Sequence, residues 1–231
     1  MIRGLKNFVA VVVSLGVAHL AFGGISIAPT LSISDGVDPV ITIIDNSPGD
    51  LNGTVGAVTM STNMGVWSLS IATGVTAPAS GGFTNPVMDL VIQASSSGAG
   101  SLTYTFSDIG YSHSNGILSA TMSGHVISGA SATVDYSVYG NGNNTLGALT
   151  TLLATTGTNS LPIVTTTSGA LALSSFFSLS QVVQLTASGP STVSVDASLN
   201  VIPEPSTTAL TFLGLTCLVV ALARRRCSLR A

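Results

Sequence analysis

The sequence predicts an all-β fold, an antiparallel β-sandwich or jelly roll, joined to a single C-terminal transmembrane helix. First, apolar and polar side chains alternate through much of residues 24–201, which is the pattern of strands with one face in a core and one in water. Second, turn-forming clusters at 46–49, 79–82 and 140–143 separate the alternating runs. Third, residues 207–223 form an uncharged, mostly apolar run typical of a membrane-spanning helix.

Residues 1–23 have the organisation of a signal peptide. A short basic segment precedes an apolar run, and the small residues Ala21 and Gly23 stand where a signal peptidase reads its substrate. We expect cleavage after Gly23, because the apolar run is short for a membrane span and the small residues follow it directly. An uncleaved N-terminal anchor is the alternative.

Residues 24–201 are predicted to form one all-β ectodomain of roughly ten to thirteen short antiparallel strands. β-Branched residues are frequent there, and helix-forming residues are scarce. Residues 144–180 alternate less regularly, and we interpret them as further strands of the same unit. A solenoid is the competing architecture, but no fixed-period repeat supports it. The clearest alternating segments are 67–71, 88–93, 102–106, 132–138 and 193–199.

The ectodomain has an unusual charge distribution. All six Lys and Arg residues of the chain lie outside residues 24–201, whereas eight aspartates lie inside, so its formal charge is minus eight. Such a surface repels a phosphate backbone, which excludes nucleic acid as a partner. Its solubility must depend on Ser, Thr, Asn and Gly, which suits hydration, hydrogen bonding to sugars or binding of divalent cations. Both cysteines lie outside the ectodomain, so it has no disulfide.

One loop carries oxygen-bearing side chains at close spacing. Asp45, Asp50 and Asn52 offer the carboxylate and amide oxygens that Ca²⁺ prefers, and Asp35 and Asp38 lie a few residues upstream. The loop lacks the bidentate Glu of an EF-hand, and Asp and Asn also favour turns because they hydrogen-bond to their own backbone. The sequence therefore leaves a Ca²⁺ site and a plain turn as alternatives, and it points to no other cofactor.

No motif indicates catalysis. Only His113 and His125 follow the predicted signal peptide, and they have neither metal-ligand spacing nor a nearby nucleophile motif. Glu is absent from residues 24–201, and the aspartates there are scattered, so a glycosidase-type carboxylate pair could be formed only by the fold and has no support in the sequence. We therefore expect a protein that is not an enzyme.

The aromatic side chains of the ectodomain divide into two groups. Trp67, Tyr104 and Tyr136 occupy apolar positions of their alternating segments, which predicts a place in the core. Tyr111 and Tyr139 do not fall on the apolar side of their segments. They are the candidates for exposed contacts with sugar rings.

Residues 202–231 combine three features in a fixed order, namely Pro203-Glu204-Pro205, the apolar run 207–223, and Arg224-Arg225-Arg226 within the basic tail 224–231. A helix over the apolar run would span about 26 Å at a rise of about 1.5 Å per residue. The arginines would stop translocation and hold their end in the cytoplasm. The prolines keep the preceding segment out of a helix and accessible to a protease.

This C-terminal arrangement resembles the sorting signal of PEP-CTERM proteins of Gram-negative bacteria, in which a Pro-Glu-Pro motif precedes a hydrophobic helix and a terminal basic cluster. The resemblance covers about the last tenth of the chain and transfers location rather than activity. It implies cleavage near the motif by an exosortase, a membrane transpeptidase, and an association with exopolysaccharide production. An ordinary single-pass anchor that is never cleaved is the alternative.

The sequence thus predicts a non-catalytic exported protein of the cell surface or extracellular matrix, processed by signal peptidase and exosortase and associated with exopolysaccharide. An inner-membrane intermediate, held in the bilayer by the C-terminal helix, would precede the surface form. A carbohydrate-binding or Ca²⁺-dependent adhesion module is the alternative function, since an acidic, hydroxyl-rich ectodomain suits either ligand.

Overall fold

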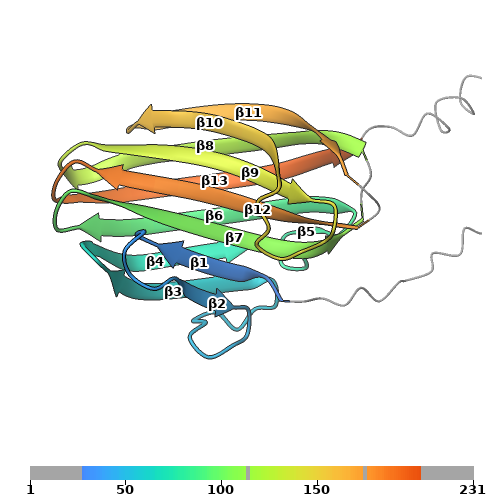
Figure 1. The fold of residues 1–231 in the computed structure, drawn as a ribbon, viewed down its shortest axis with the longest axis horizontal. Helices are drawn as coiled ribbons and strands as arrows, with labels where there is room; N and C mark the ends of the chain where they lie inside the picture. Colours follow the sequence, from blue (N-terminus) through green and yellow to red (C-terminus); the bar gives the residue numbers. More distant parts are fainter. Residues whose placement is uncertain (1–27, 113–114, 174–175, 204–231) are drawn as a thin grey trace, which may run out of the picture.

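The computed structural model describes residues 28–112, 115–173 and 176–203. These residues contain no helix and form an antiparallel β-sandwich, as the alternating pattern predicts (Figure 1). None of them belongs to a helix long and apolar enough to cross a bilayer. The predicted signal peptide, Glu204, Pro205, the apolar run 207–223 and the basic tail lie outside the described residues.

The described residues form thirteen strands, and several are longer than the short strands that the sequence predicts. The bounds are β1 (Thr30–Ser34), β2 (Ile41–Ile44), β3 (Ala57–Met64), β4 (Trp67–Val75), β5 (Gly81–Gly82), β6 (Asn85–Ser96), β7 (Gly100–Tyr111), β8 (Asn115–Gly129), β9 (Ala132–Asn141), β10 (Thr151–Ser160), β11 (Ile163–Ala172), β12 (Phe177–Ala187) and β13 (Ser191–Pro203). The less regular residues 144–180 contribute β10, β11 and the start of β12, as predicted.

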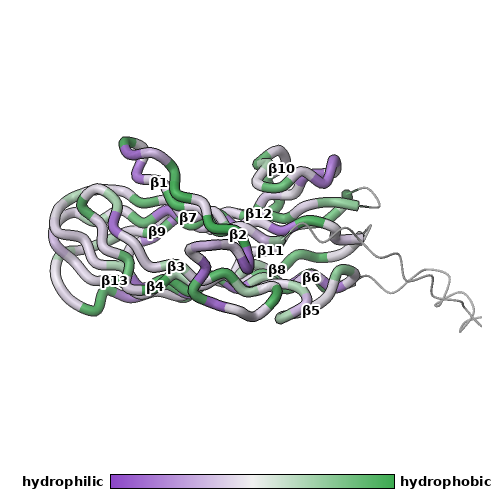
Figure 2. The backbone as a smooth tube through the Cα atoms, turned by 90° about the horizontal axis from the view of Figure 1, so that it is seen from below, coloured by the Kyte–Doolittle hydropathy of each residue, from purple (hydrophilic) through white to green (hydrophobic). Residues whose placement is uncertain are grey.

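The strands form two sheets that pack face to face. The first sheet has the order β10-β9-β12-β7-β1-β2, and the second has the order β11-β8-β13-β6-β4-β3, with β5 paired to β6. Figure 2 shows the sheets as two layers, with hydropathy changing from residue to residue along the strands. Trp67, Tyr104 and Tyr136 are at most 1% exposed, which confirms their predicted place in the core. Burial of side chains of this size contributes about 1.5–3 kcal/mol each, relative to exposure.

The sandwich has two ends with different contents. At the first, which we name the turn end, the β1–β2 loop (35–40) lies beside the β3–β4 turn (65–66) and the β6–β7 turn (97–99). At the second, the terminal end, β1 begins, β13 ends, and the long β2–β3 loop (45–56) is found (Figure 1).

Tyr111 is fully buried, so the prediction of an exposed contact at this position is wrong. The cause is a β-bulge in β7. Leu179 pairs with Asp108 and Phe177 with Tyr111, so β7 uses one more residue than β12 over this step, and Gly110 takes a positive φ of 86°. The extra residue reverses the alternation and turns Tyr111 toward the core.

The last strand continues past the expected end of the ectodomain at residue 201. β13 runs to Pro203, whose register partner on β8 is Gly116, and Ile202 pairs with Ile117. The first residue of the Pro-Glu-Pro sequence therefore belongs to the second sheet. No linker separates the sandwich from this sequence.

Candidate functional site

The predicted Ca²⁺ loop lies at the terminal end, between β2 and β3. Asp50 Oδ1 accepts hydrogen bonds from the backbone N–H groups of Asn52 and Thr59, both at 2.9 Å, and Oδ2 accepts one from Asn46 N–H at 2.9 Å. The amide oxygen of Asn52 accepts from the backbone N–H of Thr54 at 3.0 Å. Both side chains therefore shape the loop by accepting from its own amides, which is the geometry of the turn alternative.

Asp45, the third candidate ligand, is nearly buried. Its Oδ2 accepts from the backbone N–H of Gly56 at 2.8 Å, and its Oδ1 accepts from the Asn46 side-chain amide at 2.9 Å. Asp35 and Asp38 lie beyond the other end of β2, at the turn end, and do not join the loop. The described residues contain no group of three or more His, Cys, Asp or Glu side chains placed to hold a metal ion.

A second acidic feature at the terminal end was not visible in the sequence. Asp108 is 2% exposed, and its Oδ2 accepts hydrogen bonds from the Tyr111 hydroxyl at 3.0 Å and the Thr76 hydroxyl at 3.1 Å. The backbone N–H of Ile109 donates to its Oδ1 at 2.8 Å. Burial raises the pKa of Asp108 to about 6, although these donors oppose the shift. The enclosed carboxyl group is placed to hold the core together rather than to meet a ligand.

Asp89 and Asp196, which are distant in sequence, meet on the outer face of the second sheet. Asp196 pairs with Val91 and Asp89 with Ser198, so the two carboxyl groups are diagonal neighbours on one face. Partial burial and then the charge of Asp196 raise the pKa of Asp89 to about 6. Alternation shows that both side chains point outward, but only strand pairing brings them together.

The face around this pair is rich in hydroxyl and amide groups, and we name it the hydroxyl face. Cross-strand hydroxyl bonds join Ser95 to Thr192 at 2.9 Å and Thr121 to Thr166 at 3.1 Å. Because Lys and Arg occur only before residue 7 and after residue 223, no cation of this segment neutralises the two carboxyl groups. The outward polar residues of the face, besides the two aspartates, include Thr73, Gln93, Ser95, Thr121, Ser123, Thr166, Thr192, Ser194, Ser198 and Asn200.

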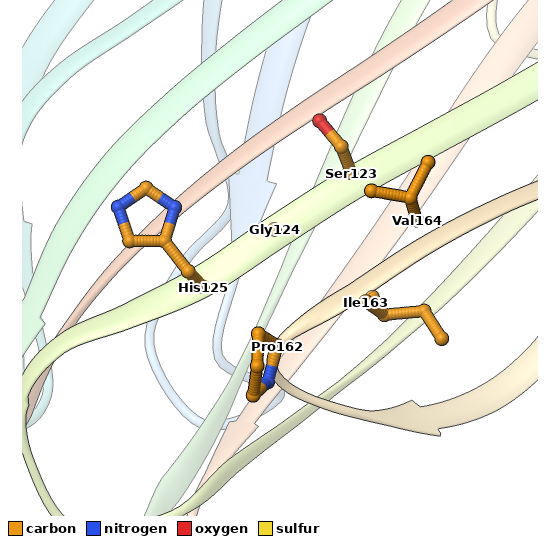
Figure 3. Close-up of a pocket in the computed structure, with 6 residues that line it drawn as sticks. All are labelled: Ser123, Gly124, His125, Pro162, Ile163 and Val164. Atoms are coloured by element: carbon orange, nitrogen blue, oxygen red, sulfur yellow. The ribbon is translucent and has the colours of Figure 1, made fainter.

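A shallow groove of about 420 Å³ opens between β8 and β11 beside the hydroxyl face. Figure 3 shows Ser123 and His125 on β8, Ile163 and Val164 on β11, and Pro162 directly before β11. His125 is exposed, as expected for a solvated histidine, and Ser123 is the register partner of Asp196. The groove thus extends the hydroxyl face toward an edge that carries apolar side chains.

Two further residues from the sequence analysis are Tyr139, a candidate for contact with sugar rings, and His113. Tyr139 lies half-buried on the outer face of the first sheet, where its partners are Leu152 and Ser180, so it stays a candidate for contact. His113 lies outside the described residues.

No protein-family model and no curated protein matches the chain. Among solved structures, the chain is similar to a carbohydrate-binding module of the β-sandwich superfamily, with 14% identity, 75% of this chain and 84% of that one covered, and a TM-score of 0.34. It is also similar to the K1 cleaved adhesin domain of Lys-gingipain from Porphyromonas gingivalis W83 (11% identity, 64% and 99% covered, TM-score 0.31). A third is the CBM22-1 xylan-binding domain of Paenibacillus barcinonensis Xyn10C (12% identity, 64% and 95% covered, TM-score 0.31). TM-scores this low carry no functional inference, so the function must be inferred from the residues of this chain.

Proposed function

We propose that this protein is an exported, non-catalytic surface or matrix protein whose β-sandwich associates with extracellular polysaccharide. The observation that carries the proposal is the hydroxyl face, where Ser198 pairs with Asp89, Ser123 pairs with Asp196, and further outward Ser and Thr hydroxyls follow without a neighbouring Lys or Arg. Val75 and Val91 are the other register partners of the pair. Sugar hydroxyls both donate and accept hydrogen bonds, so they match hydroxyls and carboxylates equally well. A broad sheet face with many such groups favours multipoint contact with a polymer over enclosure of a small molecule.

The geometry of the carboxyl pair supports a role without catalysis. The two carboxyl groups of a glycosidase stand about 5 Å or more apart, because a sugar carbon or a water molecule must lie between them. Asp89 and Asp196 are diagonal neighbours on an open sheet face, and the charge of Asp196 helps to raise the pKa of Asp89. In this arrangement the pair offers negative charge and acceptors to a bound sugar chain, but the open face does not enclose a scissile bond.

The proposed route to the surface uses both ends of the chain. Residues 1–23 direct export and are removed by signal peptidase. The run 207–223 then holds an inner-membrane intermediate as a single transmembrane helix, with Arg224, Arg225 and Arg226 on the cytoplasmic side. An exosortase cuts beside Glu204 and releases the sandwich to the cell surface or matrix. Because β13 includes Pro203, the sandwich would lie close to the membrane until that cut.

Polysaccharide association is tested by co-sedimentation of the full-length protein with the exopolysaccharide of the cells that produce it. Asp196→Asn should weaken co-sedimentation about tenfold, the effect of losing one charge-assisted hydrogen bond. Asp135→Asn is the matched control, since Asp135 points outward from the first sheet and the same charge is removed. Equal losses in both variants, or none in either, would refute the hydroxyl face as the binding surface.

The route is tested separately by the intact mass of the protein recovered from those cells. We expect a mass that lacks residues 1–23 and the segment after the Pro-Glu-Pro motif. Recovery of the unprocessed chain, arginines included, from cells with an active exosortase would contradict the sorting proposal and leave the polysaccharide test unaffected.

A further inference from the structure

A pocket of about 340 Å³ opens at the turn end, away from the centre of the hydroxyl face. Its walls come from the β1–β2 loop, the β3–β4 turn and the start of β7. Three of its polar groups are two carboxylates and one indole N–H, and exposed valines stand beside them. The side chains that matter below are Asp35, Val37, Asp38, Val66 and Trp67. We name this cavity the Trp67 pocket.

The indole N–H of Trp67 is a buried donor without an acceptor. Trp67 is 1% exposed, and its Nε1 has no hydrogen-bond partner among the described residues. A Cβ added at Gly100 would lie 3.5 Å from Nε1 and 2.8 Å from Val66 Cγ2. The indole nitrogen is closed off from solvent, because the Cγ2 methyl of Val66 lies close to the point that a Cβ at Gly100 would take. Val66 is 38% exposed and Gly100 has no side chain, so rotation of Val66 would connect the N–H to the pocket. A buried donor in this state costs about 1–3 kcal/mol, which an acceptor in the pocket would recover.

The carboxylates of Asp35 and Asp38 also line the pocket and are fixed by backbone amides. Asp35 Oδ1 accepts from Val37 N–H at 2.9 Å and from Asp38 N–H at 2.8 Å, and these donors hold the pKa of Asp35 below its ordinary value. Asp38 Oδ2 accepts from Gly65 N–H at 3.1 Å, which joins the β1–β2 loop to the β3–β4 turn. A side chain at Gly65 would collide with Asp35 Oδ2, so this glycine also keeps the carboxylate in place.

We propose that the Trp67 pocket binds one neutral sugar residue, with its hydroxyls donating to Asp35 and Asp38 and accepting from the Trp67 N–H. A hydroxyl group both donates and accepts, so the hydroxyls of one sugar can satisfy both the carboxylates and the indole N–H. Val37 and Val66 offer apolar surface to the C–H groups of the ring. The volume is within the range of about 300–1,000 Å³ found for small-ligand sites. The choice of a carbohydrate as ligand rests on the proposed function. The pocket would give the protein a second contact with polysaccharide, separate from the hydroxyl face.

Other ligand classes fit this pocket less well. A metal cation would match the carboxylates but would face the indole N–H, a donor that cannot ligate it. A phosphate or carboxylate ligand would accept from the N–H but would be repelled by Asp35 and Asp38. A ligand that carries donors and acceptors on neighbouring atoms meets both requirements.

Trp67 is the single tryptophan of the chain, so its fluorescence reports on the pocket directly. We would titrate the full-length protein, held in a detergent without a sugar headgroup, with the methyl glycosides of glucose, galactose and mannose. We expect a saturable change in emission for at least one of them, with a Kd of about 1 mM. No response to any of the three glycosides would overturn the inference. So would a saturable response to CaCl₂ alone.

Two variants and one control locate the response. Asp38→Asn should weaken binding about tenfold by removing the charge of one acceptor. Gly100→Ala should do the same, because its methyl group would stand 3.5 Å from the indole nitrogen, where the ligand hydroxyl has to lie. Its close contact with exposed Val66 is at the end of a side chain that can rotate. Asp135→Asn should leave binding unchanged. Equal binding in Asp38→Asn and the wild type would contradict the proposed contact, whatever happens to the folding of Gly100→Ala.

The glycoside titration and the co-sedimentation assay can fail independently. If the glycosides leave Trp67 unaffected while Asp196→Asn still reduces co-sedimentation, the pocket inference is wrong and the proposed function stands. If the glycosides bind but the protein does not co-sediment with the polysaccharide, the hydroxyl face is not the binding surface. The inference that the Trp67 pocket binds a sugar is then unaffected.

Discussion

The two ends of the sandwich place aspartate side chains in opposite environments, which shift the pKa of the carboxyl group in opposite directions. At the terminal end, Asp108 is enclosed, and burial raises its pKa to about 6. At the turn end, Asp35 is accessible, and backbone amide donors lower its pKa. Neither has a Lys or Arg partner in this segment of the chain. Without cations, a carboxyl group is therefore either buried at a cost, where it organises the core, or held charged by amides, where it is available to a ligand.

Replacing Tyr111 should give the largest effect at the terminal end. Its ring is buried between Phe83 and Phe177, with ring centroids 6.3 Å and 5.8 Å away, and its hydroxyl donates to Asp108. Tyr111→Ala should lower the free energy of unfolding by about 3–5 kcal/mol, because it opens a cavity in the core. Chemical denaturation measures this loss.

Tyr111→Phe separates the ring from the hydroxyl. It should lose only about 1–3 kcal/mol, the cost of removing one donor from a buried carboxyl group. A loss equal to that of the Ala variant would mean that the hydroxyl, rather than the aromatic packing, holds the terminal end.

Asp108 should make stability fall as pH rises. Its pKa is about 6 in the folded protein, above the ordinary value of 3.8, so the folded state holds the proton more tightly than the unfolded state. Its contribution is therefore fully present below about pH 4 and is lost by about pH 6, a change of about 3 kcal/mol. Asp108→Asn should remove this dependence.

Urea denaturation of Asp108→Asn and the wild type at about pH 4 and about pH 7 checks the sign and the size of the effect. The half-buried Asp89 shifts in the same direction, but it is present in both proteins and cancels in the comparison. Parallel pH profiles for the two proteins would contradict a buried, proton-binding Asp108.

The turn end should respond to acid differently. Because the pKa of Asp35 lies below 3.8, the carboxylate stays charged, and glycoside binding should change less than twofold between about pH 7 and about pH 5. Trp67 fluorescence titrations at each pH measure this. A loss of binding with a midpoint near pH 6 would mean that a group other than Asp35 controls the pocket.

Calcium should have the smallest effect. The side-chain oxygens of Asp45, Asp50 and Asn52 accept from loop amides or a neighbouring side-chain amide, so chelation with EDTA should move the Tm by less than about 1 °C. Thermal melts with and without CaCl₂ test this. A saturable rise in Tm that Asp50→Asn abolishes would instead establish the loop as a Ca²⁺ site.

Much of the fold could be predicted because one period-two pattern determines which side chains face the core. That rule placed Trp67, Tyr104 and Tyr136 correctly, and it failed at Tyr111, where a bulge inserts one residue and reverses the alternation. A bulge depends on pairing with β12, and the strict period of β7 gives no sign of it.

The candidate sites were harder to predict because they depend on register between distant strands. Asp89 and Asp196 are separated by most of the ectodomain and meet only because β6 pairs with β13. The Trp67 pocket similarly requires three turns to meet at one end, and the absence of a side chain at Gly100 has meaning only once Trp67 lies beside it. Composition did predict the character of these surfaces, since the lack of Lys and Arg left hydroxyls and carboxylates to form them.

The indole N–H resonance of Trp67 tests most directly whether the turn end is the end that binds a ligand. The full-length, ¹⁵N-labelled protein should give one indole cross-peak, because the chain has one tryptophan. We predict that this cross-peak shifts progressively as a neutral methyl glycoside is added, and that the same shift in Asp38→Asn requires about tenfold more glycoside. An indole cross-peak that does not move at saturating glycoside, while resonances of the terminal end do, would contradict the account.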